Sequence, residues 1–328
     1  RDNFAFRHPL VQEAAYGSLL TEQRRQFHQG AAAALAIQFR EQADEHASLI
    51  GHHWEEGGQS LFAASSYLKF ALWIGARDPR NTLDSWRSVR RLLQDRPAPT
   101  PIEVEYMLMM ACGQIVNYAW WQGIDAAEIE PVFQQALALA HKLKDMRAAA
   151  LIIMAFGRIL MITGSSDDYV AKVEEAQKFN EGTGNQSVDA FLRAVYSHAL
   201  LTAGLLPQAL EANALALDCV HRIDQRDRQT LGFDPETWLR TLRARILLYL
   251  DRFAEADIIL GDLLDGRALD TVHRVNAHGT RIEGYRKTRT DIALDEAAQL
   301  RAILQKNATP YLKVIGNRYC ALALLAGG

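Results

Sequence analysis

Cysteine and proline are scarce in this chain of 328 residues, which has 3 cysteines and 9 prolines. Cys112, Cys219 and Cys320 each lie inside an apolar run, with no second cysteine or paired histidine beside them. This pattern argues against a disulfide framework and against a structural zinc site. It predicts three small buried side chains in a reducing compartment, and we therefore expect a cytoplasmic protein.

Long apolar runs and an excess of one charge are also missing. The most apolar segment, AAALIIMAFGRILMI, is interrupted by Arg158 and is shorter than the roughly 20 residues that cross a bilayer. The chain carries 36 basic and 39 acidic residues, a net charge of −3. We therefore expect neither a membrane nor a nucleic acid as partner. The start at Arg1, without a signal sequence, predicts a segment of a longer protein.

Motifs that carry catalysis are absent too. The sequence has no Gly-rich elbow around a serine, no GxxxxGK[ST] phosphate loop and no carboxylate pair of the cyclase kind. His52 and Glu56 are four residues apart and could share a helical face, but two ligands do not make a metal site. We expect no enzyme activity, no metal and no cofactor in this segment.

What the sequence does contain is helical periodicity. Prolines stand where helices should begin, as in the capping box Thr100-Pro101-Ile102-Glu103 and in Asp234-Pro235. The only candidate for a strand is NFAFR near the N-terminus. Predicted helices span 43–57 and 59–77, an extra one at 80–95, then 101–121 and 125–144, 146–163 and 166–181, 186–203 and 206–222, 235–250 and 253–264, 270–287 and 290–305, and a last one from 310.

The second helices of these pairs resemble one another. LLPQALEANALAL, DRFAEADIILGDLL and DIALDEAAQLRAIL each follow a short turn and carry a small alanine. If Ala171, Ala209, Ala256 and Ala297 are equivalent, they repeat at intervals of 38, 47 and 41 residues. These intervals exceed the roughly 34 residues of a tetratricopeptide (TPR) repeat. We predict an all-α, right-handed superhelical solenoid of TPR-like helix pairs, with a compact helical bundle as the alternative.

Several segments carry a resemblance to a known family. They are FAFRHPLVQEAAYGSLLTEQRRQFHQGAAAAL, ASLIGHHWEEGGQSLFAASSYLKFALW, SWRSVRRLL, MRAAALIIMAFGRILMITGS and DRQTLGFDPETWL. They are similar to the helical-repeat region that follows a STAND-type ATPase in bacterial proteins with a class III adenylate/guanylate cyclase domain. The resemblance implies that residues 1–40 end a winged-helix module, with NFAFR as its last strand, and that 41–328 form a TPR-like repeat domain.

The same resemblance implies a function. The segment would be a non-catalytic regulatory, sensor and protein-interaction domain of a multidomain signalling ATPase that is linked to a cyclase. Its partners would be the upstream ATPase and cyclase domains and an unknown protein or small-molecule effector. The domain could also form an oligomer. The alternatives are a passive scaffold or self-association arm, and the sensor domain of an ATP-dependent transcriptional regulator, because such regulators carry a segment similar to the opening one.

Candidate binding residues are polar positions on the first helices of the last pairs. Arg240 and Arg243 share one face, and we expect the concave wall to carry Arg240, Arg243, His273, Asn276, Arg281 and Tyr285. Together they would grip an anionic ligand or an acidic peptide. The alternative is a solvated face with local ion pairs.

Two further features call for a partner. Trp120 and Trp121 predict either an exposed aromatic platform or, alternatively, one ring that caps the core and one that covers a turn. Arg158 is the only charged residue between 148 and 163, so its guanidinium needs an acceptor. We predict an ion pair with Asp168, or with Glu175 as second choice; the alternative is that Arg158 extends to solvent.

Overall fold

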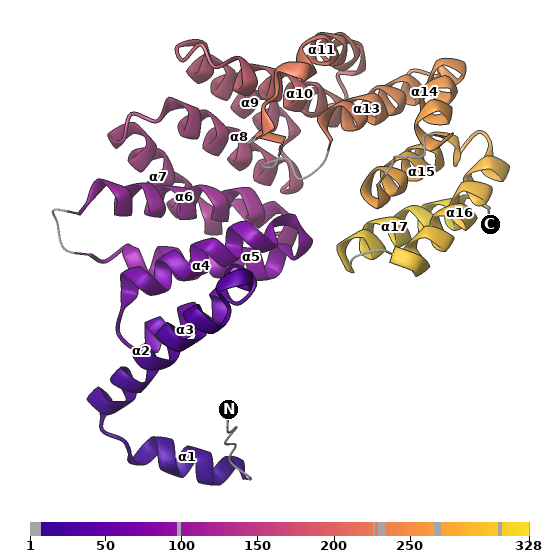
Figure 1. The fold of residues 1–328 in the computed structure, drawn as a ribbon. Helices are drawn as coiled ribbons and strands as arrows, with labels where there is room; N and C mark the ends of the chain where they lie inside the picture. Colours follow the sequence, from indigo (N-terminus) through magenta and orange to yellow (C-terminus); the bar gives the residue numbers. More distant parts are fainter. Residues whose placement is uncertain are drawn as a thin grey trace. The chain divides into compact units, whose positions relative to one another are not determined.

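The computed structural model describes residues 8–96, 100–225, 227–228, 234–265, 270–307 and 310–327, and all regular structure in these ranges is helical. The chain divides into two compact units, Arg1–Lys144 and Asp145–Gly328 (Figure 1). The predicted all-α, TPR-like fold is confirmed. The strand NFAFR lies outside the described residues, so the winged-helix module and the boundary at residue 40 stay predictions.

The first unit is a succession of helices that pack in antiparallel order from α2 to α7. They are α1 (Pro9–Ser18), α2 (Thr21–Gln38), α3 (Ala47–Glu56), α4 (Ser60–Ile74), α5 (Pro79–Leu93), α6 (Ile102–Ala119) and α7 (Ala126–Lys142), with 3-10 turns η1 (Arg40–Gln42), η2 (Gly75–Arg77) and η3 (Trp120–Gln122). From α2 onward each helix packs on the next one. α2 and α3 form a first hairpin, so α5 is the second helix of the hairpin that α4 begins and is not an extra helix.

The helix α5 shows how local sequence sets these elements. Asp78 caps its start by accepting a hydrogen bond from the backbone N–H of Asn81, and Pro79 occupies the first helical position. Leu83, Trp86 and Val89 recur at helical spacing and are completely buried. The arginines of SWRSVRRLL therefore lie on the remaining faces of the helix.

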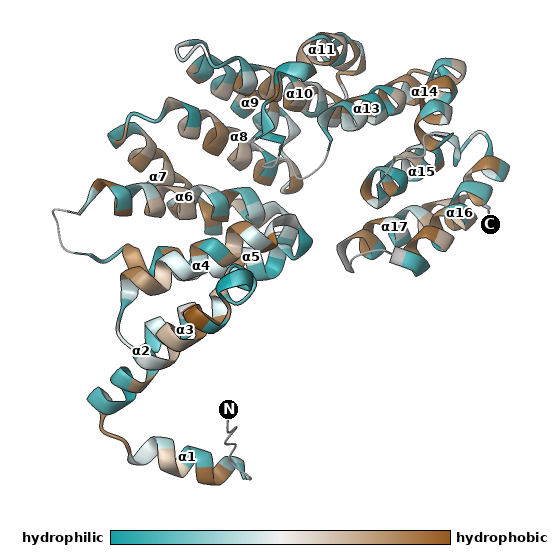
Figure 2. Cartoon of the chain, viewed as in Figure 1, coloured by the Kyte–Doolittle hydropathy of each residue, from teal (hydrophilic) through white to brown (hydrophobic). Residues whose placement is uncertain are grey.

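The second unit continues the same pattern in two layers. Its first-helix layer consists of α8 (Met146–Ile162), α10 (Gln186–Thr202), α13 (Pro235–Tyr249), α15 (Thr271–Tyr285) and α17 (Pro310–Gly327). The second helices are α9 (Ser166–Glu181), α11 (Leu206–Cys219), α14 (Phe253–Asp265) and α16 (Thr290–Asn307), with the 3-10 turn η4 (Val220–Arg222) after α11. Hydrophobic and hydrophilic positions alternate along these helices, as expected where one side is covered (Figure 2).

An acidic or amide cap starts each of the first four helices in the first-helix layer. Asp145, Asn185, Asp234 and Asp270 accept hydrogen bonds from the backbone N–H three residues ahead, at 2.8, 3.1, 2.8 and 2.8 Å. Such a cap satisfies one of the backbone donors that a helix start leaves unpaired. These caps explain why the predicted and observed starts of these helices agree closely.

The alanines predicted at the helix contacts are buried with one exception. Ala209, Ala256 and Ala297 are buried, whereas Ala171 is exposed, so its equivalence to them is wrong. The fully buried residue near the start of α9 is Tyr169. Its large ring fits because Gly157 of α8 lies opposite: a Cβ on Gly157 would come within 3.0 Å of the ring.

The helix α8 contains the most apolar segment of the sequence and is covered nearly all round. Every residue from Ile152 to Gly157 is buried. Cys112, Cys219 and Cys320 are buried free thiols, which confirms their prediction as small core residues, and burial raises the pKa of Cys112 to about 11. No helix in the described part of the chain combines the length and apolar character that crossing a membrane requires.

Two glycines of the second unit give opposite predictions for the same substitution. A Cβ on Gly279 of α15 would overlap the ring of Tyr319 in α17, whereas nothing lies within 4 Å of a Cβ on Gly261 of α14. We expect Gly279→Ala to lower the free energy of unfolding by about 1–2 kcal/mol through overpacking. Gly261→Ala should raise it by about 0.5–1 kcal/mol through helix propensity. Urea unfolding followed by circular dichroism measures both, and shifts of the same sign would contradict this packing.

Candidate functional site

A row of polar side chains crosses the first-helix layer of the second unit. This polar row consists of Arg158 (α8), His198 (α10), Arg245 (α13), Thr280 and Glu283 (α15), and Arg318 and Tyr319 (α17). Its first four members each directly follow a small buried residue, namely Gly157, Ser197, Ala244 and Gly279. Small residues allow close approach of neighbouring helices, so the side chain that follows lies within reach of the next element.

The small residues fix the row in place. Gly157 packs against Tyr169 and Lys172 of α9. The Ser197 hydroxyl donates a hydrogen bond to the carbonyl of Ala209 in α11, at 3.1 Å. Because each first helix is held against its partner helix at this point, Arg158 and His198 are presented from a fixed backbone.

His198 lies between two arginines. Its Nδ1 is 3.3 Å from the hydroxyl of Tyr169, and its ring centroid is 5.8 Å from that of Trp238 in α13. Burial and, after it, the positive charges of Arg158 and Arg245 lower the pKa of His198 to about 3. The imidazole is therefore neutral at physiological pH.

Arg245 connects three helices. Its Nη2 donates to the hydroxyls of Thr280 and Tyr319, each at 3.1 Å. Its Nε lies 3.2 Å from a carboxylate oxygen of Glu283, without the alignment of a hydrogen bond. The other carboxylate oxygen of Glu283 is 3.9 Å from Arg318. Two arginines, Arg245 and Arg318, thus share the carboxylate of Glu283, and Arg158 adds a third positive charge to the polar row.

Arg158 does not form either of its predicted ion pairs. Asp168 accepts a hydrogen bond from the hydroxyl of Ser165, and Glu175 lies 2.7 Å from Lys172. Arg158 lies instead beside the Tyr169 hydroxyl, whose pKa burial raises and the guanidinium partly lowers. The reason is the direction of helical side chains, which tilt toward the helix N-terminus. The guanidinium therefore points away from the turn that leads to Asp168.

The predicted residues of α13 face the second helices. Arg240 lies 3.5 Å from Asp262 of α14. The pKa of Glu255, which also lies in α14, is lowered first by the hydrogen bond from Arg252 and further by the nearby charge of Arg243. Arg240 and Arg243 do share a face, but its neighbour is α14. The residue of α13 that points along the first-helix layer is Arg245.

The predicted residues of α15 also have local partners. Arg281 donates to Glu296 of α16 at 2.8 Å and lies 3.9 Å from Asp257 of α14. The hydroxyl of Tyr285 donates to the same Asp257 at 2.6 Å. Both side chains therefore connect α15 to second helices. Local ion pairs of this kind are the alternative to a shared binding groove.

His273 and Asn276 do not join these residues. The Nε2 of His273 lies 3.2 Å from the carbonyl oxygen of Asp234 and its Nδ1 is 2.8 Å from Asp270, so it links the starts of α13 and α15. Asn276 is half-buried. It precedes Tyr285 by nine residues, which is two and a half helical turns, so the two lie on opposite sides of α15. The structure does not bring the six predicted residues into one groove.

Trp120 and Trp121 form a pair in the first unit. Both lie in η3 and are half-buried, with ring centroids 4.7 Å apart. The indole Nε1 of Trp120 is buried and has no hydrogen-bond partner among the described residues. The two rings therefore cover the turn between α6 and α7 more than they present an open platform.

Comparison with known proteins identifies the fold. No protein-family model matches this sequence, and no curated protein matches it. A Rap protein solved in complex with the competence and sporulation factor is similar in structure, with a TM-score of 0.55 and 10% identity over 97% of this chain and 92% of that one. A STAND protein with a tetratricopeptide repeat sensor from Pyrococcus horikoshii has a TM-score of 0.48 and 11% identity; the match covers 98% of this chain and 47% of that one.

The neutral state of His198 predicts a pH dependence of stability. In the unfolded chain His198 takes up a proton near pH 6.5, whereas in the folded chain it does so only near pH 3. The contribution of neutral His198 to the free energy of unfolding is therefore complete above pH 6.5. It is lost as the pH falls below 6.5, at about 1.4 kcal/mol per pH unit. Between pH 7.5 and 5.0 the wild type should lose about 2 kcal/mol more unfolding free energy than His198→Asn.

Urea unfolding at the two pH values measures this difference. His221→Asn, at an exposed histidine of η4, is the matched control and should follow the wild type. Equal losses in the wild type and in His198→Asn would show that His198 is not held neutral by its surroundings.

Proposed function

We propose that this chain is a non-catalytic regulatory domain that binds an anionic effector at the polar row. One observation carries the proposal: Arg158 and Arg245 flank a neutral His198, and of the two arginines only Arg245 has a carboxylate partner among the described residues. A half-buried guanidinium without a counter-charge favours an incoming carboxylate or phosphate. The neutral imidazole beside it can accept or donate a further hydrogen bond.

The row also offers a route from binding to a change of state. Its side chains come from α8, α10, α13, α15 and α17, so an anion held by Arg158 and Arg245 would contact more than one helix pair at once. A ligand shifts a conformational equilibrium only by its difference in affinity for the two states. Such a difference arises naturally here, because the distance between the two arginines depends on how the helix pairs stack.

The fold supports an effector-binding role. The Rap protein of similar fold was solved in complex with the competence and sporulation factor, and this complex supports a binding role for a chain of this fold. The resemblance of the opening and repeat segments to cyclase-linked STAND ATPases supports a bacterial signalling ATPase as the full-length context, with the upstream ATPase and cyclase domains as partners. A passive scaffold would use the same helices without an effector. A transcriptional regulator of the same ATPase class would use them with one.

Anion binding is tested with a fluorescent tetraglutamate peptide and with pyrophosphate. Arg158→Gln should weaken binding of at least one of them about tenfold or more, because a charged hydrogen bond is lost. Arg240→Gln, which removes an arginine that faces α14, is the matched control and should bind like the wild type. Fluorescence anisotropy and calorimetry at low salt provide the dissociation constants.

The outcomes separate the candidate functions. Equal weakening by Arg158→Gln and Arg240→Gln would show a diffuse charge effect and would refute the polar row as the site. No binding of either probe at low salt would favour the passive scaffold.

A further inference from the structure

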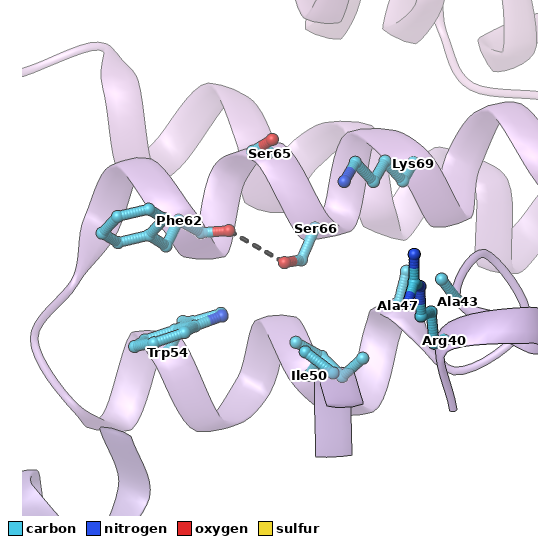
Figure 3. A pocket seen from close by; sticks show the side chains of 10 residues that line it. Arg40, Ala43, Ala47, Ile50, Trp54, Phe62, Ser65, Ser66 and Lys69 are labelled. Atoms are coloured by element: carbon cyan, nitrogen blue, oxygen red, sulfur yellow. Dashed lines mark hydrogen bonds between the residues drawn. The ribbon is translucent and has the colours of Figure 1, made fainter. Parts of the chain in front are cut away.

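A second candidate binding site lies in the first unit, as a groove between η1, α3 and α4 (Figure 3). Its volume is about 270 Å³. The residues that shape it are Arg40, Ala47, Ile50, Trp54, Phe62 and Lys69. None of the sequence motifs pointed to this groove, and it is separate from the polar row because it belongs to the other unit.

The groove has an aromatic end and a cationic end. Trp54 and Phe62 lie together at one end, with ring centroids 5.1 Å apart. Arg40 and Lys69 lie at the other end, as Figure 3 shows. Ile50 forms the floor between them. Trp54 follows Ala47 by seven positions, a rise of about 10 Å along α3, which sets the length of the apolar part.

The two cations have no carboxylate partner among the residues that the structure describes in this unit. The ion pairs there are made by Arg25, Arg87, Arg91 and Lys142. The hydroxyl of Ser66, in the middle of the wall, donates to the carbonyl of Phe62 at 2.9 Å and is therefore already satisfied. Phe62 itself is 59% exposed, so an apolar ligand would cover surface that now faces water.

We propose that this groove binds a small amphipathic carboxylate. Its apolar tail, about eight carbons long, would lie along Ile50 and against Trp54 and Phe62, since that length matches two turns of α3. Its carboxylate would sit between Arg40 and Lys69, which supply two positive charges and several N–H donors. A neutral ligand would form no ion pair with Arg40 or Lys69, and the two cations would repel an amine.

Isothermal titration with octanoate tests the proposal. Octanoate should bind, and hexanoate should bind about tenfold more weakly because two methylene groups are lost from the apolar contact. Octanol and octylamine have the same tail without the negative charge and should bind at least tenfold more weakly than octanoate. These arms distinguish recognition of a carboxylate from simple partition of a chain into an apolar groove.

Two variants and a control locate the site. Lys69→Gln and Arg40→Gln should each weaken octanoate about fivefold to tenfold, whereas Arg80→Gln, at an exposed arginine of α5 outside the groove, should have no effect. Ser65→Leu places a larger side chain in the groove wall and should abolish binding while the circular dichroism spectrum stays unchanged. If Ser65→Leu unfolds, the two charge variants still decide the question.

Three results would overturn the proposal. They are equal affinity for octanol and octanoate, equal effects of Arg80→Gln and Lys69→Gln, and no heat of binding for octanoate up to about 5 mM, a concentration at which even a weak specific site is occupied. Arg158→Gln should leave octanoate binding unchanged. The groove and the polar row can therefore fail or succeed independently of each other.

Discussion

The close approach of helices at small residues is the constraint on which the second unit depends. Gly157 admits the ring of Tyr169, Gly279 admits the ring of Tyr319, and a Cβ on Gly284 would lie only 2.6 Å from Leu248. Interiors packed this densely leave no room for even one extra methyl group. Because neighbouring first helices are this near, the guanidinium of Arg245 can reach Thr280 and Tyr319 on two other helices.

This packing also creates the electrostatic character of the polar row. A half-buried guanidinium keeps its charge, because arginine does not release its proton under these conditions. Arg245 forms an ion pair with Glu283 and donates hydrogen bonds to two hydroxyls. These contacts largely offset the free-energy cost of removing its charge from water. Arg158 has a tyrosine hydroxyl in place of a carboxylate. The same packing that holds the helices together therefore leaves a positive site next to a neutral His198.

The sequence predicts the helices well because the signals that start and stop a helix are local. Asp145 and Asp234 cap helices whose observed starts lie within a residue of the predicted ones. The site was less predictable, since a shared face of Arg240 and Arg243 does not reveal which neighbouring helix that face meets. The prediction that Asn276 and Tyr285 share a face is wrong for a reason of helical periodicity. Nine residues turn an α-helix through two and a half turns, which places the two side chains on opposite sides. The ion pair predicted for Arg158 ignores the tilt of helical side chains toward the helix N-terminus.

The residues that the sequence reading missed do leave a trace in it. Gly157-Arg158, Ser197-His198, Ala244-Arg245 and Gly279-Thr280 are four pairs in which a small residue precedes a polar one, in four successive first helices. Each pair alone is an ordinary dipeptide, and the intervals between them are unequal, so no fixed period reveals them. Only when the helix contacts are known do the small residues identify equivalent positions. In irregular repeats the packing position, and not the distance along the chain, therefore marks where a functional side chain is placed.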